Sequence, residues 1–258
     1  MPTLVECRDL FECNEVARKY GLDFIEINMS FPQYCADSLD VTALKKLCSD
    51  TGVGYTIHAD EMLNPFDFNP KVSGAYFEVM RDTIRGAKEL SAPIINLHLQ
   101  KGVYTTLPGK VLMLNDVYRE EYLAIGREFV SMCEEEIADS GVRIAIENVD
   151  SNPFTEAQLE LISIMMKSPV FGLTLDTGHD RCLGHRDLAV FDKYPDRLIH
   201  MHLHDSDGRS AHLPLGEGDV DPGAVITRLA GGNTCLVEVK SVDGLAKSVS
   251  RLKALNIM

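Results

Sequence analysis

Short apolar runs alternate with longer segments of helical periodicity along the whole chain. The runs are too short for helices and are rich in Ile, Val, Leu and Phe, which is typical of buried parallel strands. We predict eight strands, at Thr3–Glu6, Phe24–Asn28, Tyr55–His58, Ile94–His98, Arg143–Glu147, Phe171–Asp176, Leu198–His202 and Thr234–Val239. The segments between them predict helices, the clearest of which are Leu10–Tyr20, Lys71–Leu90, Tyr118–Ala138 and Val242–Leu255.

Strands that alternate with helices form right-handed βαβ units and a parallel sheet. Eight such units in 258 residues favour one α/β domain over residues 1–258, a (β/α)8 TIM barrel. The alternative, an open doubly wound sheet, usually carries a GxGxxG turn after its first strand, whereas CRDLFEC follows the first strand here. Two long connections, 100–116 and 203–222, are expected to be lids or binding loops at the carboxyl face of the barrel.

Six of the predicted strands carry a charged or imidazole side chain at their last position or, in the final strand, one residue before it. These residues are His58, His98, Glu147, Asp176, His202 and Glu238. The carboxyl ends of barrel strands meet at one mouth, so we expect the six side chains to converge there. One such residue could be a hydrogen-bonded structural group. Six in succession favour a site for Zn²⁺, Mn²⁺ or a similar ion, because carboxylates crowded together without a cation repel one another.

Further histidines lie close to these strand ends in the sequence. His179 stands one turn beyond the sixth strand, and His212 precedes the turn LGEG. The direction of His204 stays open, because it lies past the end of its strand. His200 is expected deeper in the barrel as a structural residue. Asp205 is expected to orient a loop or a ligand histidine rather than to bind metal.

Composition and charge narrow the function classes. The chain carries 25 Lys and Arg against 39 Asp and Glu, a formal charge of −14, which opposes a nucleic-acid partner. No apolar stretch of about 18 residues predicts a membrane span. The seven cysteines form no CxxC pair, and the first residues do not resemble a signal peptide, so we expect reduced thiols in a cytoplasmic protein.

Seven motifs occur in order over nearly the whole chain. They are IHAD (57–60), INLHLQKG (95–102), AIENVD (145–150), LDTGHD (175–180), MHLHD (201–205), HLPLGEGD (212–219) and LVEVK (236–240). Together they resemble the xylose isomerase-like barrel superfamily, which includes sugar isomerases and epimerases and also endonuclease IV. The resemblance to the epimerase branch implies one divalent metal held by Glu147, Asp176, His202 and Glu238. The resemblance to the endonuclease branch implies three zinc ions, with additional ligands at His58, His98, His179 and His212.

The sequence departs from the endonuclease pattern at three positions. Ser210 stands where that branch has an Asp ligand, which puts a complete third metal site in doubt. Glu61 replaces an aromatic residue that distorts DNA, and Ala211 replaces an Arg just before the last His. All three departures weaken the case for a DNA substrate.

The resemblance favours an isomerase or epimerase of a sugar, a sugar phosphate or a related polyol. In this hypothesis one to three divalent ions, Mn²⁺ or Zn²⁺, are bound, and Glu147 and Glu238 transfer a proton around a metal-stabilised enediolate. His179 and Arg181 would contact the substrate. The alternatives are an endonuclease IV-like zinc phosphoesterase, a dehydratase or lyase on the same site, and a barrel that binds a metabolite without turnover. Association into a homo-oligomer stays open.

Overall fold

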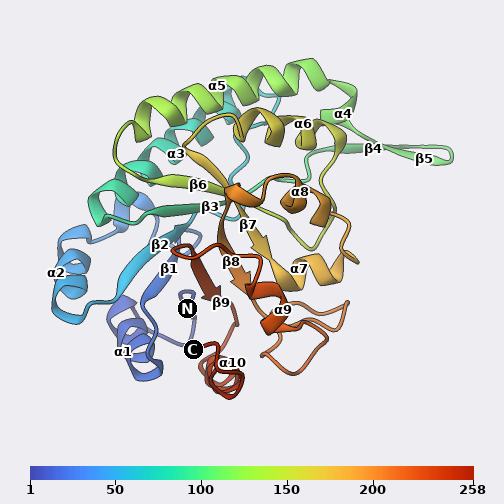
Figure 1. Ribbon diagram of the computed structural model, residues 1–258. Coiled ribbons are helices and arrows are strands. Elements are labelled where there is room, and N and C mark those ends of the chain that lie inside the picture. The colour runs from blue at the N-terminus through green and yellow to red at the C-terminus, as the bar shows by residue number, and fades with distance from the viewer.

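The chain folds into a barrel whose wall is one parallel sheet (Figure 1). The computed structural model describes residues 1–258. Around the wall run the strands β1 Phe24–Asn28, β2 Gly54–His58, β3 Ile94–His98, β6 Arg143–Glu147, β7 Phe171–Asp176, β8 Leu198–Leu203 and β9 Thr234–Val237. Each pairs in parallel with the next, so all carboxyl ends open on the same face. The predicted TIM barrel is confirmed, and these seven strands begin and end within two residues of their predicted bounds.

The predicted first strand, Thr3–Glu6, was wrong. In this region only Pro2 forms a bridge, an isolated one to Glu26 of β1. The chain then turns at once, because the N–H of Cys7 donates to the carbonyl of Leu4 at 3.0 Å. The turn leaves too few extended residues for a ladder, so no hydrogen-bonded ladder joins β1 to β9 and the barrel is nearly, but not fully, closed.

Helices cover the outside of the barrel and return the chain from one strand to the next (Figure 1). The longer ones are α1 Leu10–Tyr20, α2 Val41–Thr51, α3 Pro70–Leu90, α5 Arg119–Ile137, α6 Glu156–Met165 and α10 Val242–Ala254. The short ones are α4 Leu114–Val117, α7 Thr177–Cys182, α8 Leu188–Lys193, α9 Pro222–Ile226, η1 Ala36–Ser38 and η2 Pro195–Arg197. The four predicted helices match α1, α3, α5 and α10 within one residue. Asp9 caps the start of α1, and Gly21, at φ 74°, ends it.

Alternate side chains of each strand point into the barrel and form layers across its interior. Two of these layers are polar. The upper level consists of the strand-end residues. The lower level consists of Glu26, Thr56, Asn96, Thr174 and His200, which are all buried. The main apolar core lies outside the barrel wall, where Phe129 of α5 packs against Phe66 and Phe77 with ring centroids 5.2 and 5.6 Å away. The fold therefore encloses its ionisable groups inside the barrel.

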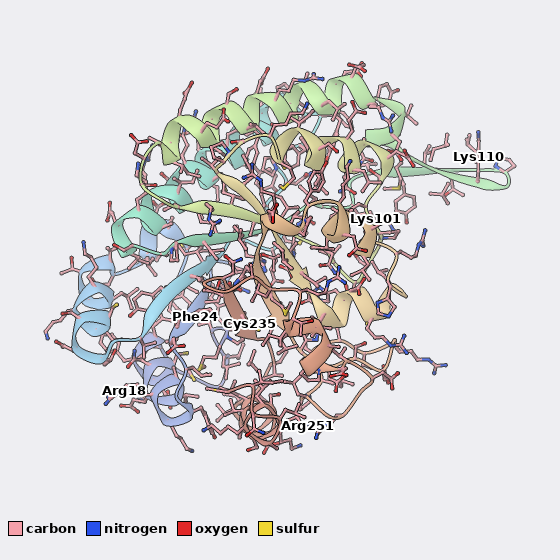
Figure 2. The ribbon with its side chains drawn as sticks, in the orientation of Figure 1. Arg18, Phe24, Lys101, Lys110, Cys235 and Arg251 are labelled. Carbon is pink, nitrogen blue, oxygen red and sulfur yellow. The ribbon has the colours of Figure 1, made fainter.

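The two long connections differ in structure. Most of residues 100–116 forms an antiparallel ribbon, β4 Tyr104–Leu107 and β5 Lys110–Met113, which projects from the body (Figure 1). Figure 2 shows Lys110 at the far end of this ribbon and Lys101 on the body near its base. Residues 203–222 fold back over the barrel mouth and are held by a bridge between Asp205 and Leu213.

Two further expectations concern helices and thiols. No helix of the structure combines the length and the apolar character that crossing a membrane requires. All seven cysteines are free.

Candidate metal centre and active site

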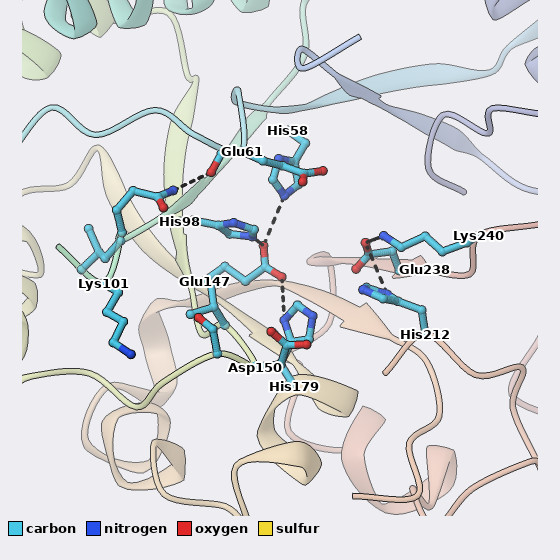
Figure 3. A pocket seen from close by; sticks show the side chains of 14 residues that line it. His58, Glu61, His98, Lys101, Glu147, Asp150, His179, His212, Glu238 and Lys240 are labelled. Atoms are coloured by element: carbon cyan, nitrogen blue, oxygen red, sulfur yellow. Dashed lines mark hydrogen bonds and ion pairs between the residues drawn. The ribbon is translucent and has the colours of Figure 1, made fainter. Parts of the chain in front are cut away.

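Side chains from the strand ends converge at the carboxyl face of the barrel. A cavity of about 270 Å³ opens there, and its lining includes His58, His98, Glu147, His179, His212 and Glu238 (Figure 3). Asp176 and His202 are fully buried beside it and complete the set. The structure therefore brings together all eight residues that the sequence analysis named as ligands.

The tightest group surrounds one nitrogen of His202. Its Nδ1 lies 3.0 Å from Glu147 Oε1, 3.0 Å from Glu238 Oε2 and 3.9 Å from Asp176 Oδ2. One ligand atom from each of these four residues lies within 4.8 Å of the other three. Three carboxylate oxygens and one imidazole nitrogen are a donor set that suits Zn²⁺ or Mn²⁺.

The electrostatics of this group keep its carboxylates ionised. Burial alone would raise the pKa of Glu147, but the neighbouring His202 and His98 rings hold it well below its usual range. Burial likewise opposes ionisation of Glu238, and His202 again holds the pKa well below that of a free carboxyl. Burial disfavours the charged form of His202, but Glu147, Glu26 and Glu238 raise its pKa well above the ordinary value. Positive charge at this point is therefore strongly favoured.

Orphaned polar atoms show that the residues fit a cation. Glu238 Oε2 and His212 Nδ1 are buried without an aligned hydrogen-bond partner. Burial lowers the pKa of His212 to about 4, so its ring is neutral and keeps a lone pair. Buried polar atoms normally find a partner, and a bound cation would provide one here.

A second group shares the other oxygen of Glu147. Its Oε2 lies 2.9 Å from His98 Nε2 and 3.5 Å from His58 Nε2, and it accepts a hydrogen bond from the side chain of Asn96. The Nδ1–H of His58 donates to the carbonyl of Ala59 at 2.8 Å, which leaves its Nε2 directed at the cavity. Two imidazoles and a carboxylate can bind a second ion, with Glu147 between the two positions.

The third group contains His179, His204 and His212, whose ring nitrogens lie within 4.8 Å of one another. The backbone N–H of His212 donates to His204 Nδ1 at 2.8 Å, so a neutral His204 ring carries its proton on Nε2. That Nε2 lies 2.9 Å from the Asp176 carboxylate. His204, whose direction the sequence left open, therefore holds Asp176 in place and has no free nitrogen. The ring fits because residue 178 is glycine, where a Cβ would lie 2.0 Å from it.

Two basic side chains near the site, Arg181 and Lys240, differ in whether they reach the cavity. The guanidinium of Arg181, predicted to contact substrate, lies 2.8 Å from Asp219, and Arg181 does not line the cavity. Lys240, which the sequence analysis did not select, lines the cavity with its Nζ 3.0 Å from Glu238 Oε1 (Figure 3). Its position two residues after Glu238 is a signal that period-two alternation could have identified.

Glu26 is a buried carboxylate next to the candidate metal centre that the strand-end pattern does not predict. It lies in the middle of β1 and contacts both His200 and His202, and it reaches His202 at Nε2, the ring nitrogen opposite the carboxylates of Glu147 and Glu238. Burial alone would raise the pKa of Glu26, but these two histidines hold it far below its usual range. A glutamate inside the apolar run FIEIN is the signal that could have identified it, since an unpaired buried carboxylate is costly.

Asp205 organises the loop over the barrel mouth, and its predicted role is confirmed. Its carboxylate is buried and accepts backbone N–H groups from Ser206, Gly216, Gly218 and Val220 at 2.8–2.9 Å. This loop carries His212 to the cavity.

Asp205→Ala is expected to lower the free energy of unfolding by about 3–5 kcal/mol, because it leaves several buried donors without an acceptor. Urea unfolding followed by circular dichroism measures the loss. Asp207→Ala is the control, because exposed Asp207 accepts two N–H groups in the same loop and should cost far less. Equal losses in the two variants would contradict this role of Asp205.

The chain is similar in sequence and in structure to several known proteins. Residues 15–255 match the sequence profile described as "Xylose isomerase-like TIM barrel". The uncharacterized protein MJ1311 of Methanocaldococcus jannaschii is 28% identical over 251 residues, which covers 93% of this chain and 82% of that one. A solved D-tagatose 3-epimerase-like protein is 25% identical, with a TM-score of 0.79 over 99% of this chain and 97% of its own. The IOLI protein, solved with a zinc atom, is 16% identical, with a TM-score of 0.73 over 98% and 93% of the two chains.

Proposed function

Because the chain belongs to the xylose isomerase-like TIM barrel family, we propose that it is a divalent-metal-dependent isomerase or epimerase of a small carbohydrate. The observation that carries the proposal is the pair of buried carboxylates, Glu147 and Glu238, each with an oxygen 3.0 Å from His202 Nδ1. The name of the D-tagatose 3-epimerase-like protein supports a sugar as the substrate class.

Glu147 and Glu238 are suited to proton transfer on the two faces of one substrate carbon. They come from β6 and from the residue after β9, and they reach the cavity from opposite sides (Figure 3). One carboxylate, in its ionised form, removes the proton beside a carbonyl and becomes a carboxylic acid. The other carboxyl group, which enters the turnover protonated, delivers its proton to the opposite face or to the neighbouring carbon and ends ionised; proton exchange with water then restores the starting pair. A divalent ion held by these glutamates with Asp176 and His202 would supply electrostatic stabilisation for the negative charge that develops on the substrate oxygens.

The remaining groups bind and orient the substrate. His179 and Lys240 line the cavity wall. Lys240 can donate hydrogen bonds to sugar oxygens, whereas a neutral His179, whose Nδ1–H donates to the carbonyl of Asn148 at 3.0 Å, can accept from a sugar hydroxyl at Nε2. The second group, His58 and His98 with Glu147 Oε2, provides a place for a second ion. Arg181 has no direct role in this proposal, because it pairs with Asp219 outside the cavity.

An exchange experiment tests the proposal. Protein loaded with Mn²⁺ or Co²⁺ is incubated in D₂O with a panel of free and phosphorylated ketoses, and proton NMR follows the α-proton of each sugar after the metal is removed. We expect loss of that signal for at least one sugar, and no loss with EDTA-treated protein or with Asp176→Asn. Failure of metal-loaded protein to exchange any sugar in the panel would contradict the proposal.

The second candidate is a zinc-dependent phosphoesterase like endonuclease IV. The observation that favours it is the gathering of His58, His98 and Glu147 in the same cavity, since neighbouring metal ions suit phosphate chemistry. The charge of −14 opposes it. Glu61 also opposes it, because this residue lines the cavity where the DNA-distorting aromatic would stand. Incision of a duplex with an abasic site by zinc-loaded protein, but not by apoprotein, would favour this candidate.

A further inference from the structure

Glu26 lies under the candidate metal centre and is almost fully buried, with 2% of its surface exposed. Its Oε1 is 3.0 Å from His202 Nε2. Its Oε2 is 3.2 Å from His200 Nε2 and accepts a hydrogen bond from Thr56 Oγ1 at 3.1 Å. The carboxylate therefore faces three groups that can donate protons, from β2 and β8.

The protons on His200 can be assigned from its two neighbours. His200 Nδ1 lies 2.6 Å from the hydroxyl and 3.1 Å from the carbonyl of Thr234, so this side of the ring can accept or donate. The Glu26 carboxylate at Nε2 can only accept and decides the tautomer, and the Thr234 hydroxyl then donates to Nδ1. A neutral His200 ring then carries its proton on Nε2 and donates it to Glu26. Thr56 donates to the same oxygen, so Glu26 Oε2 accepts two hydrogen bonds. Glu26 and His200 therefore offer no free lone pair to a separate cation.

The charge of Glu26 is not needed for these two neutral donors. The carbonyl oxygen of a glutamine would accept the same hydrogen bonds from Thr56 and His200 without the cost of burying an ion. The charge matters at His202, whose Nε2 is buried with no aligned hydrogen bond and has Glu26 Oε1 at 3.0 Å. Glu147 and Glu238, each 3.0 Å from Nδ1, favour a proton on that nitrogen. Glu26 favours a proton on Nε2 instead, so that Nδ1 can give up its proton when a cation takes its place between the glutamates.

We propose that Glu26 is a positioning residue that keeps the proton of His202 on Nε2, so that the Nδ1 lone pair stays available to the cation. The inference rests on the proposed function, because it assumes that His202 Nδ1 is a metal ligand. A carboxylate behind a metal-bound histidine fixes the ring and its tautomer and raises the basicity of the ligand. Glu26 does this without occupying a coordination position, because His202 stands between it and the centre.

The main test measures Mn²⁺ affinity. Apoprotein is titrated with Mn²⁺ in competition with a fluorescent chelator, for wild type, Glu26→Gln and the control Thr56→Val. Thr56→Val removes a donor to the same carboxylate and leaves its charge in place. We expect Glu26→Gln to raise the dissociation constant about 10–100-fold, and Thr56→Val to change it less than about threefold. Circular dichroism confirms that each variant is folded.

The outcomes separate the inference from the proposed function. Equal affinity of wild type and Glu26→Gln, or equal losses in the two variants, would overturn the role of Glu26 alone. A wild-type protein that binds no Mn²⁺ would overturn the proposed function, and this inference with it.

A second measurement needs no variant. Nitrogen-15 NMR of histidine-labelled, zinc-loaded wild type reports which ring nitrogen of His202 carries the proton. We expect Nε2–H, with its proton signal shifted downfield by the hydrogen bond to Glu26. An Nε2–H without that shift would overturn the role of Glu26 even if Glu26→Gln fails to fold, whereas a proton on Nδ1 would overturn Nδ1 as a ligand and the proposed function with it.

Discussion

Glu238→Gln is expected to slow the interconversion of sugar epimers by about 10³-fold, within the range that loss of a general acid or base produces. Glutamine fills the same volume at this buried position but neither removes nor returns a proton at the reacting carbon. Because Glu238 is also a candidate ligand, the rate is measured at saturating Mn²⁺, with bound metal determined in the same samples. Progress is followed by chromatography of the two epimers.

Glu147→Gln is expected to slow the interconversion of epimers to a similar extent. It should differ from Glu238→Gln in which epimer still exchanges its α-proton with solvent. If the two carboxylates serve opposite faces, each variant keeps the base for one epimer and loses the base for the other. Deuterium wash-out from the two epimers should then show reciprocal patterns in the two variants. Glu217→Gln is the matched control, because Glu217 pairs with Lys247 on the surface, and its rate should equal that of wild type. A Glu238→Gln protein with more than a tenth of the wild-type rate would contradict the assignment.

Removing divalent ions is expected to lower the melting temperature by about 10 °C. A ligand that binds only the native state at a thousandfold excess over its Kd stabilises by about 4 kcal/mol. In a chain of this length each kcal/mol corresponds to about 2–4 °C. The physical reason is that Glu147, Asp176 and Glu238 are buried together around a single imidazole nitrogen, so their mutual repulsion is relieved when a cation binds. Differential scanning calorimetry with MnCl₂ and with EDTA measures the difference.

Asp176→Asn should remove most of this metal-dependent shift. Asp176 is fully buried and provides one of the four donor atoms. Asp219→Asn is the control, because Asp219 pairs with Arg181 away from the cavity, and it should keep the full shift. Identical melting temperatures of wild type with and without metal would show that these residues do not hold a cation.

The strand-end residues could be predicted because the signals are local. A short apolar run that finishes on His98 or Asp176 fixes both the strand and the direction in which its end opens. The parallel topology then brings such ends together without any knowledge of side-chain packing. The same reasoning failed at Thr3–Glu6, because the turn at Leu4 depends on a backbone hydrogen bond that the apolar pattern does not reveal.

The residues behind and around the centre could not be predicted from such patterns. A glutamate inside the run FIEIN marks Glu26 as unusual, but its contacts with His200 and His202 are recognisable only once β1 and β8 are known to come close inside the barrel. The direction of His204 depends on the backbone N–H of His212, eight residues away in a loop. Arg181 lies within a short helix after β7, and its partner Asp219 comes from the connection that follows β8. Tertiary packing, and not local sequence, decides all three.

The first residues of the chain, and not a strand ladder, fill the junction between β1 and β9. The N–H of Thr3 donates to the carbonyl of Glu26, and the N–H of Glu26 donates to the carbonyl of Met1, each at 2.9 Å. On its other side β1 forms a five-residue ladder with β2. We therefore expect local opening of the barrel to begin at this seam, beside Glu26 and Glu238, while the ladders from β2 to β8, which carry most of the candidate ligands, stay intact.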